Sequence, residues 1–237
     1  MLIIITLLNK KVDLFFVGNE VNTNDHDFLD YCNKYQSLIG VEDLEYRPDH
    51  VKNLVKNLKW INLGGGHHIT RSDYKLNKLT NFLLELKAKT NCQIILEPGE
   101  AVVFESGILV GEILDYIQGD NNKIPNIGIT DISPVCHMPD VIEAPYRPIL
   151  MNEPLKGKKV VLGGPSCLAG DIIGEYYFLK NPKIGDKVVF LDQAHYTLVK
   201  TNFFNGINHP EIVLWNSDNN DFKIIKSFDF KDFETRN

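Results

Sequence analysis

The sequence predicts an α/β portion followed by a mainly β domain, with the boundary near residue 104. Before this boundary, continuous apolar runs of strand length alternate with a helical pattern, which is typical of parallel βαβ units whose strands are buried on both faces. After it, short strand-like runs are separated by Gly, Pro, Asn and Asp turns, which is typical of a β domain. We therefore expect two domains, residues 1–104 and 105–237.

The α/β portion begins with two apolar runs, LIIITLL and VDLFFV, that we expect to be short buried strands. Residues 28–35 are compatible with a short helix, and Arg47-Pro48-Asp49 is typical of a helix start. KWINLGGG then predicts a strand that runs into a glycine turn. Leucines at helical spacing predict a helix over residues 74–89, and CQIILEPGE predicts the next strand. Strand, helix and strand in this order indicate a parallel pair.

The mainly β domain is expected to contain strands in five segments: GILVGEILDYIQ, NIGITDIS, KVVLGG, DKVVFLDQAHYTLVKT and EIVLWNSD. Each is rich in β-branched or aromatic residues and is bounded by turn residues. No internal repeat or low-complexity tract interrupts them. This composition favours a single mainly β domain after residue 104.

Charge and cysteine content narrow the class of protein. The formal net charge is −6 and no basic stripe stands out, which argues against a nucleic-acid partner and is compatible with cationic small molecules. The apolar start lacks a basic region and a cleavage site, and it is too short to span a bilayer. Four cysteines, with no CxxC pair, favour a reducing, cytoplasmic location. We expect no membrane partner.

Two motifs lie at the ends of predicted strands in the α/β portion. Gly64, Gly65 and Gly66 have no Cβ, so their backbone N–H groups could converge on a phosphate, although a tight structural turn is the alternative. Glu97 of the EPGE motif follows the next strand, at the edge where parallel sheets bind ligands. It could act as an acid, a base or a partner of a ring nitrogen, and a surface turn is the alternative. No metal-ligand spacing is present around His67 and His68.

Three further features lie in the β domain. Cys167 and Asp171 share the glycine-rich loop GGPSCLAGD, where a thiol could exchange a proton or be a small buried hydrophobe. The segment from 131 to 148 is rich in prolines and charges, and could bind a charged substrate or a partner chain; it contains His137, Asp140, Glu143 and Arg147. Tyr196 follows an apolar strand and could also be a residue at the edge of the core.

The order of these motifs resembles one enzyme family. LGGG, EPGE, HMPD with PYRP, GPSCLAGD, and HYT with FNG follow one another as in the fold-type III pyridoxal-phosphate decarboxylases, which act on ornithine, diaminopimelate or carboxynorspermidine. The resemblance covers roughly residues 57–237. It implies a partial (β/α)8 alanine-racemase-like barrel over residues 1–104, followed by a C-terminal β domain with substrate and dimer loops.

The resemblance also implies roles for single residues. Gly64, Gly65 and Gly66 look like the loop that holds the phosphate of pyridoxal 5′-phosphate, and Tyr196 like a tyrosine near that phosphate. Glu97 matches the glutamate that pairs with the pyridine nitrogen and keeps the ring able to accept electrons. Cys167 matches the cysteine that reprotonates the substrate carbon from a partner subunit. Asp171 lies where the family places a carboxylate for the distal amine of the substrate.

Charge at two positions indicates the substrate class. Members that act on ornithine or diaminopimelate usually have Arg after EPG, and the diaminopimelate enzymes also have an Arg near position 143. Here the residues are Glu100 and Glu143. With Asp140, these acids would repel a second carboxylate and attract an amine. The resemblance therefore favours decarboxylation of carboxynorspermidine or carboxyspermidine, in the biosynthesis of norspermidine or spermidine.

One expected part of the family's active site has no match. The lysine that forms a Schiff base with the cofactor lies well before the glycine loop in this family, and none of the lysines before Gly64 has that context. We therefore expect a truncated or split chain that acts as a homodimer or with a missing N-terminal part. The alternatives are a non-catalytic interaction domain and a diaminopimelate- or ornithine-type decarboxylase.

Overall fold

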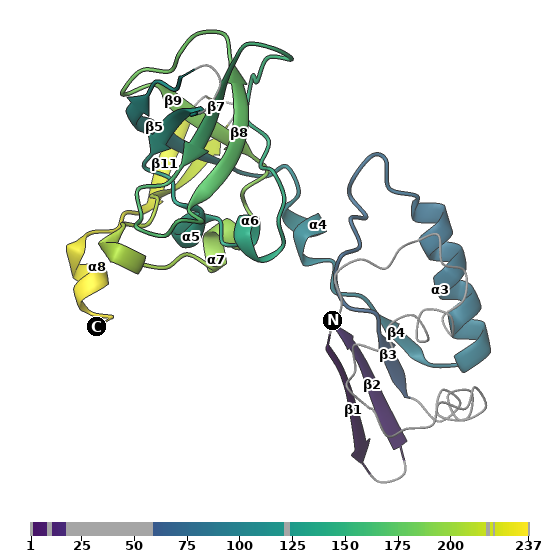
Figure 1. Ribbon diagram of the computed structural model, residues 1–237. Coiled ribbons are helices and arrows are strands. Elements are labelled where there is room, and N and C mark those ends of the chain that lie inside the picture. The colour runs from purple at the N-terminus through teal and green to yellow at the C-terminus, as the bar shows by residue number, and fades with distance from the viewer. Residues whose placement is uncertain are drawn as a thin grey trace. The chain divides into compact units, whose positions relative to one another are not determined.

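The structure is a computed structural model that describes residues 2–8, 11–17, 59–120, 124–216, 219 and 221–236 (Figure 1). The chain divides into two units, Met1–Phe104 and Glu105–Asn237, which are described here one at a time. The helices expected over residues 28–35 and from Arg47 lie outside the described residues. None of the helices in the described ranges has the length and apolar character to cross a bilayer.

The first unit contains a four-stranded sheet in the order β1-β2-β3-β4. Its strands are β1 (Leu2–Leu8), β2 (Lys11–Val17), β3 (Trp60–Asn62) and β4 (Gln93–Ile95). β1 and β2 form the two expected apolar strands and pair antiparallel. β2 pairs with β3, and β3 with β4, in parallel. The carboxyl ends of β3 and β4 therefore lie at the same edge of this sheet.

Helix α3 (Leu76–Thr90) connects β3 to β4 and confirms the expected βαβ unit. Leu79 and Leu86 are buried, as the leucine spacing requires for a helix that lies along the sheet (Figure 1). The helix ends at Asn91, which adopts the left-handed conformation with φ 54° and donates its backbone N–H to Lys87 O. Helix α4 (Gly99–Val103) follows β4 directly after Pro98.

The barrel expected over residues 1–104 stays a prediction. The parallel pairs β2–β3 and β3–β4 agree with part of such a barrel. The antiparallel hairpin of β1 and β2 departs from it, because every strand of a (β/α)8 barrel runs parallel to its neighbours. What the described residues form is a mixed sheet covered by α3.

The second unit is built on a five-stranded mixed sheet in the order β8-β7-β6-β5-β9, which confirms the mainly β character expected after residue 104. The strands are β5 (Ile108–Ile117), β6 (Asn126–Thr130), β7 (Lys158–Gly163), β8 (Ile172–Phe178) and β9 (Lys187–Leu191). The first half of β5 pairs with β9 and its second half with β6, with a register shift between Ile113 and Asp115. A long strand shared in this way curls the sheet.

One hydrophobic cluster fills the inside of the curled sheet. Alternate residues of the strands face inward, as Leu109 and Ile113 do on β5 and Val188 and Phe190 do on β9. Tyr176 of β8 is fully buried and packs edge-to-face on Phe190, with ring centroids 5.7 Å apart. Aromatic pairs of this geometry add about 0.5–1.5 kcal/mol to the burial of their area. This core supports the loops that emerge at the ends of the strands.

Short helices gather at one end of this sheet (Figure 1). They are α5 (Pro134–His137), α6 (Asp140–Glu143) and α7 (Tyr196–Val199), with a 3-10 turn at Phe204–Gly206. The chain ends with the hairpin of β10 (Ile212–Asn216) and β11 (Asp221–Lys226), and with helix α8 (Phe230–Glu234). The strand expected through HYTLVKT is therefore wrong after Leu191, because α7 begins at Tyr196.

Candidate functional site

The GGG and EPGE motifs lie side by side in the first unit, because β3 and β4 are parallel neighbours. Asn62 at the end of β3 is opposite Ile95 at the end of β4. The pairing continues beyond the strands, since Leu63 N donates to Ile95 O at 2.9 Å and Glu97 N donates to Gly64 O at 2.8 Å. The two motifs are thus one structural feature at the carboxyl edge of the sheet, where ligands bind in parallel sheets.

Each of the three glycines has a backbone reason to lack a side chain. Gly64 and Gly66 have positive φ values of 70° and 79°, a conformation that favours glycine. A Cβ on Gly65 would lie 3.0 Å from the carbonyl oxygen of Glu97. Within the described part of the chain, the N–H groups of Gly65 and Gly66 have no hydrogen-bond partner. Backbone N–H groups in such a turn are a suitable cradle for a phosphate.

Asn62 joins the glycine turn to Glu97, a role that sequence reasoning missed. Its side-chain Nδ2 donates to Glu97 Oε1 at 2.7 Å, and its Oδ1 accepts a hydrogen bond from Gly64 N at 2.8 Å. Asn62 is 4% exposed, whereas Glu97 is exposed. The buried amide of Asn62 therefore fixes the Glu97 carboxylate, which remains accessible to a ligand. A polar residue at the end of a buried strand, directly before the glycines, is the one signal that could have identified it.

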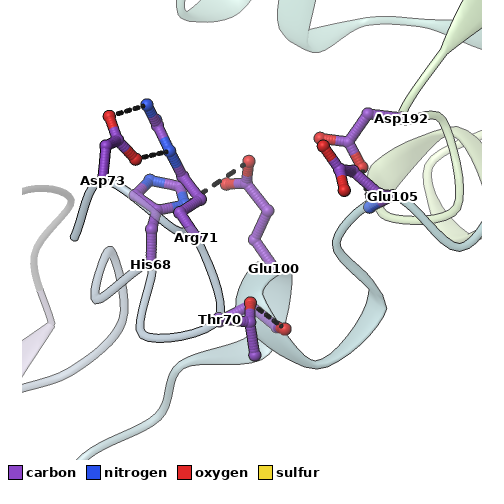
Figure 2. Close-up of polar contacts among 8 residues, drawn as sticks. His68, Thr70, Arg71, Asp73, Glu100, Glu105 and Asp192 are labelled. Atoms are coloured by element: carbon purple, nitrogen blue, oxygen red, sulfur yellow. Dashed lines mark hydrogen bonds and ion pairs between the residues drawn. The ribbon is translucent and has the colours of Figure 1, made fainter. Parts of the chain in front are cut away.

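Glu100 and the two histidines lie next to this feature. Figure 2 shows the Glu100 side chain directed toward His68, with 3.8 Å between His68 Nδ1 and Glu100 Oε1. Nearby, Thr70 Oγ1 donates to Ala101 O at 2.6 Å and so joins the loop after the glycines to α4. His67 is buried, and burial lowers the pKa of its imidazole. The neutral ring of His67 therefore adds no charge beside the glycine turn.

In the second unit, the Cys167 loop connects β7 to β8. Cys167 is exposed, whereas Cys92 and Cys136 are buried. The loop is closed at its base by a hydrogen bond from Gly164 N to Asp171 O at 2.8 Å. A thiol at the tip of a closed, exposed loop can meet a ligand, as the sequence predicted.

Asp171 lies beneath this loop and is 4% exposed. Its Oδ1 accepts hydrogen bonds from Ser133 Oγ at 2.8 Å and Val135 N at 3.1 Å, and its Oδ2 accepts one from Ser166 N at 3.0 Å. The contact with a substrate amine that the resemblance implies stays a prediction. A buried carboxylate with three internal donors is better suited to holding the surrounding segments together.

Asp140 and Glu143 of α6 share one cation. Lys200 Nζ lies 2.7 Å from Asp140 Oδ1 and also forms an ion pair with Glu143. These hydrogen bonds raise the pKa of the Lys200 ammonium. The two acids can therefore hold an ammonium group, and in this structure they hold one from the protein itself. Lys200 also lies over the ring of Tyr196, 5.3 Å from its centroid, and Tyr196 is 47% exposed on α7.

Arg147 has internal partners that the sequence did not reveal. Its Nε donates to Glu175 O at 2.9 Å, its Nη2 pairs with Glu153 at 2.5 Å, and its guanidinium lies 4.0 Å from the ring centroid of Tyr176. The pairing with Glu153 raises the pKa of Arg147. Arg147 therefore fixes its own loop to β8. Asp192 has a similar local role, because its Oδ1 accepts a hydrogen bond from Glu105 N at 2.8 Å (Figure 2).

The residues at the edge of the first unit fit pyridoxal phosphate. The glycine turn offers backbone N–H groups to a phosphate, and Glu97 offers an exposed, fixed carboxylate to a basic ring nitrogen. Cys167, Asp140, Glu143 and Tyr196 belong to the second unit. The structure therefore brings together Gly64–Gly66, Glu97 and Glu100 in one unit, and the remaining expected residues in the other.

Comparison with known proteins identifies the relatives of this chain. Residues 15–194 match the family described as pyridoxal-dependent decarboxylase, C-terminal sheet domain. The chain is 41% identical to carboxynorspermidine/carboxyspermidine decarboxylase of Campylobacter jejuni, over 77% of this chain and 50% of the relative. It is 36% identical to carboxyaminopropylagmatine decarboxylase of Synechocystis, over 93% of this chain and 54% of the relative.

A solved structure agrees with these relatives. The crystal structure of the Campylobacter jejuni carboxynorspermidine decarboxylase, in complex with norspermidine, is similar with a TM-score of 0.71 and 35% identity. The similarity covers 98% of this chain and 62% of that chain. The chain thus spans about half the length of the curated relatives that it matches.

Proposed function

Since this chain belongs to the pyridoxal-dependent decarboxylases, we propose that it carries the cofactor edge and the substrate loops of an enzyme that decarboxylates a carboxylated polyamine. The cofactor of this family is pyridoxal 5′-phosphate. The observation that carries the proposal is the hydrogen-bonded set of the glycine turn, Asn62 and Glu97. Carboxynorspermidine and carboxyspermidine are the substrates that we favour.

Glu97 and the glycine turn hold the two ends of the cofactor. When bound, the pyridine ring supplies an electron sink for the bond that breaks. The N–H groups of Gly65 and Gly66 bind the phosphate, and Glu97 accepts a hydrogen bond from the protonated ring nitrogen. The side chain of Asn62 forms hydrogen bonds to both Glu97 and the backbone of Gly64. Because one buried side chain fixes both contacts, the spacing between them is set before the cofactor binds.

Cys167 supplies the proton that replaces the carboxylate. The bond between the substrate carbon and its carboxyl group breaks, carbon dioxide leaves, and the electron pair stays with the substrate. The Cys167 thiol then gives its proton to that carbon, a C–H bond forms, and the thiolate takes up a proton from solvent. The exposed position of Cys167 supports this role, and the family resemblance supports its action on the active site of a partner subunit.

Acidic side chains select the amines of the substrate. Glu100 borders the cofactor edge, and Asp140 and Glu143 form an acidic pair that binds the ammonium of Lys200. We propose that an amine of the polyamine takes the place of Lys200 at this pair. A second substrate carboxylate, as in diaminopimelate, would be repelled, because these two acids face only one ammonium group. The contact of Asp171 with a substrate amine, which only the resemblance implies, is not part of this proposal, because the carboxylate is buried.

The assembly is also part of the proposal. Tyr196 is assigned to the cofactor phosphate by the resemblance, and its exposure on α7 supports contact with a ligand. No lysine before Gly64 has the family context of the Schiff-base lysine. The missing lysine supports a complex in which a separate chain supplies it, the resemblance supports a homodimer, and the cysteine content supports a cytoplasmic location.

Two alternatives concern the reaction itself. The similarity to carboxyaminopropylagmatine decarboxylase favours, as a second substrate, a polyamine that ends in a guanidinium group. A third alternative is that the chain is an interaction domain with no catalytic activity. Turnover of diaminopimelate in preference to both polyamines would instead place the chain with diaminopimelate decarboxylases.

Carbon dioxide release tests the substrate class. The chain is supplied with pyridoxal phosphate, with and without the N-terminal half of the Campylobacter jejuni relative, and is given carboxynorspermidine, carboxyaminopropylagmatine or diaminopimelate. We expect the carboxylated polyamines to be preferred. Glu100→Arg should lower kcat/KM for them by about 10- to 100-fold relative to diaminopimelate, the equivalent of the ~1.5–3 kcal/mol of a charged hydrogen bond.

Glu85→Arg is the matched control, because Glu85 is an exposed residue of α3 that pairs locally with Lys89. It makes the same charge change away from the cofactor edge and should leave the ratio of substrates as it is. An unchanged ratio in Glu100→Arg would refute the selection by charge. Release from none of the substrates in either preparation would favour the interaction domain.

A further inference from the structure

The Cys167 loop is held from inside by one carboxylate. Asp171 ends the loop, and its Oδ2 accepts a hydrogen bond from the backbone N–H of Ser166, directly before Cys167. On the other side of Cys167, the Leu168 carbonyl accepts a hydrogen bond from Asp171 N at 3.0 Å. The Leu168 N–H donates to Ser166 Oγ at 3.3 Å. Both neighbours of Cys167 are therefore bound to Asp171, and they are also joined to each other.

The other oxygen of Asp171 anchors the loop to the core. Oδ1 accepts hydrogen bonds from Ser133 Oγ and Val135 N, at the start of α5. Ser133 is fully buried, and its own N–H donates to His137 Nδ1 at 3.1 Å. The position of the exposed thiol is thus tied through a single side chain to the buried end of β6 and α5. A network in which every member has partners is rigid.

The backbone of Gly164 packs closely against this carboxylate. A Cβ on Gly164 would lie 2.3 Å from Asp171 Oδ2 and 2.7 Å from Ser133 Cα. By contrast, a Cβ on Gly170, in the same loop, would have nothing within 4 Å. The close approach is therefore confined to the side of the loop that faces Asp171.

We propose that Asp171 is the positioning residue of Cys167, and that it acts through the loop and not through contact with the substrate. This inference rests on the proposed role of Cys167 as the proton donor. Its physical basis is that a displacement of about 1 Å at a reacting group can lower a rate by roughly 100-fold. Asp171 sets the position of the thiol by fixing the peptide groups on both sides of it.

The test replaces Asp171 by Asn in the purified chain and measures hydrogen exchange over residues 164–171. An amide side chain has a single acceptor oxygen, so its NH₂ group would meet a donor whichever way the amide turned. We expect amide exchange in the loop to rise by about tenfold or more, with the strands of the second unit unchanged. Asp186→Asn is the matched control, because Asp186 Oδ2 also accepts a backbone hydrogen bond, from Lys183 N, in a distant turn.

A second readout separates positioning from loop stability. In the preparation that releases carbon dioxide, a displaced thiol would leave the substrate carbon without its proton, and the product would leave as an aldehyde while its amino nitrogen and two electrons would pass to pyridoxal phosphate. Asp171→Asn should raise the ratio of aldehyde to amine product toward that of Cys167→Ala, and Asp186→Asn should not. If Cys167→Ala itself gives no aldehyde, the proposed proton donor is wrong, whereas the exchange data still report on the hydrogen bonds of Asp171 alone.

Two results would overturn the inference. One is hydrogen exchange of residues 164–171 in Asp171→Asn that equals the wild type. The other is a looser loop whose product ratio stays at the wild-type value while Cys167→Ala changes it. Should Asp171→Asn not fold, Ser133→Ala decides, because it removes the hydroxyl that donates to Asp171 Oδ1 and leaves the carboxylate in place. Faster exchange over residues 164–171 and a higher aldehyde ratio are expected there, and wild-type behaviour would contradict the proposal.

Discussion

At the scale of single residues, three buried polar side chains hold the loops of the candidate site. Asn62, His137 and Asp171 are 4%, 2% and 4% exposed, and each accepts a hydrogen bond from a backbone N–H group in its own loop. Burial of a polar group without partners costs about 1–3 kcal/mol. These residues therefore stabilise one loop geometry and penalise others, which is what a site needs before its ligand arrives.

His137 shows how such a residue is also fixed in its protonation state. Its Nδ1 accepts a hydrogen bond from Ser133 N, so the ring proton must lie on Nε2, which donates to Asn208 O at 2.9 Å. Burial lowers the pKa of His137 below its ordinary value of 6.5. A proton on Nδ1 would remove the acceptor that Ser133 N needs. The neutral ring is thus part of the fold of the second unit.

The neutral state of the buried His137 ring predicts that the stability of the fold depends on pH. Below pH 6.5 the unfolded chain binds a proton at His137 that the folded chain does not, so the free energy of unfolding should fall as the pH is lowered from about 6.5 toward the folded-state pKa. Above pH 6.5 this contribution is fully present. Chemical denaturation of the second unit at pH 7.5 and pH 5.5 measures the difference. His137→Asn should reduce it, and an identical difference in the variant would argue against His137 as its source.

At the scale of elements, the loop between β7 and β8 offers a matched pair of glycines. Gly164→Ala places a Cβ against Asp171 and Ser133, whereas Gly170→Ala places one in open space. We expect Gly164→Ala to cost about 1–3 kcal/mol, the usual cost of overpacking, and Gly170→Ala to be close to neutral. Thermal unfolding of both variants checks this. Equal changes in Tm would mean that the close approach at Gly164 does not constrain the loop.

Some elements could be predicted from the sequence and others could not, for physical reasons. Helix α3 has leucines at helical spacing, and strands β5 and β9 contain runs of β-branched and other apolar residues, so the local sequence was enough to predict them. Strand β8 was missed because Gly174 and Glu175 interrupt its apolar pattern. Helix α7 has only four residues, too few for a helical period to be visible, and its β-branched and aromatic residues are typical of a strand.

The site shows the same division. The glycine turn and Glu97 belong to two recognisable sequence motifs. Each motif follows a predicted strand, and the parallel pairing of β3 and β4 brings them together. Partners such as Lys200 and Ser133 could not be predicted, because each acts through contacts with residues far away in the sequence. Single polar residues carry no periodic signal, so only the structure identifies them.

At the scale of the whole molecule, the expected functional residues are divided between the two units. The cofactor edge belongs to Met1–Phe104, and the thiol loop, the acidic pair and Tyr196 belong to Glu105–Asn237. The family that residues 15–194 match is described as pyridoxal-dependent decarboxylase, C-terminal sheet domain, and the match extends over parts of both units. The cofactor edge is the claim on which the rest of the proposed function depends.

The most direct test of that claim is calorimetric titration of the purified chain with pyridoxine 5′-phosphate, which has the phosphate and the ring nitrogen but no aldehyde to react with lysines. We predict binding at least roughly tenfold tighter than that of pyridoxine, and a loss of about tenfold in Asn62→Ala, which releases both Glu97 and Gly64. Asn81→Ala, on the exposed face of α3, should bind as the wild type does. Equal affinity for the two ligands, or unchanged binding in Asn62→Ala, would contradict the assignment of the glycine turn and Glu97 as the cofactor site.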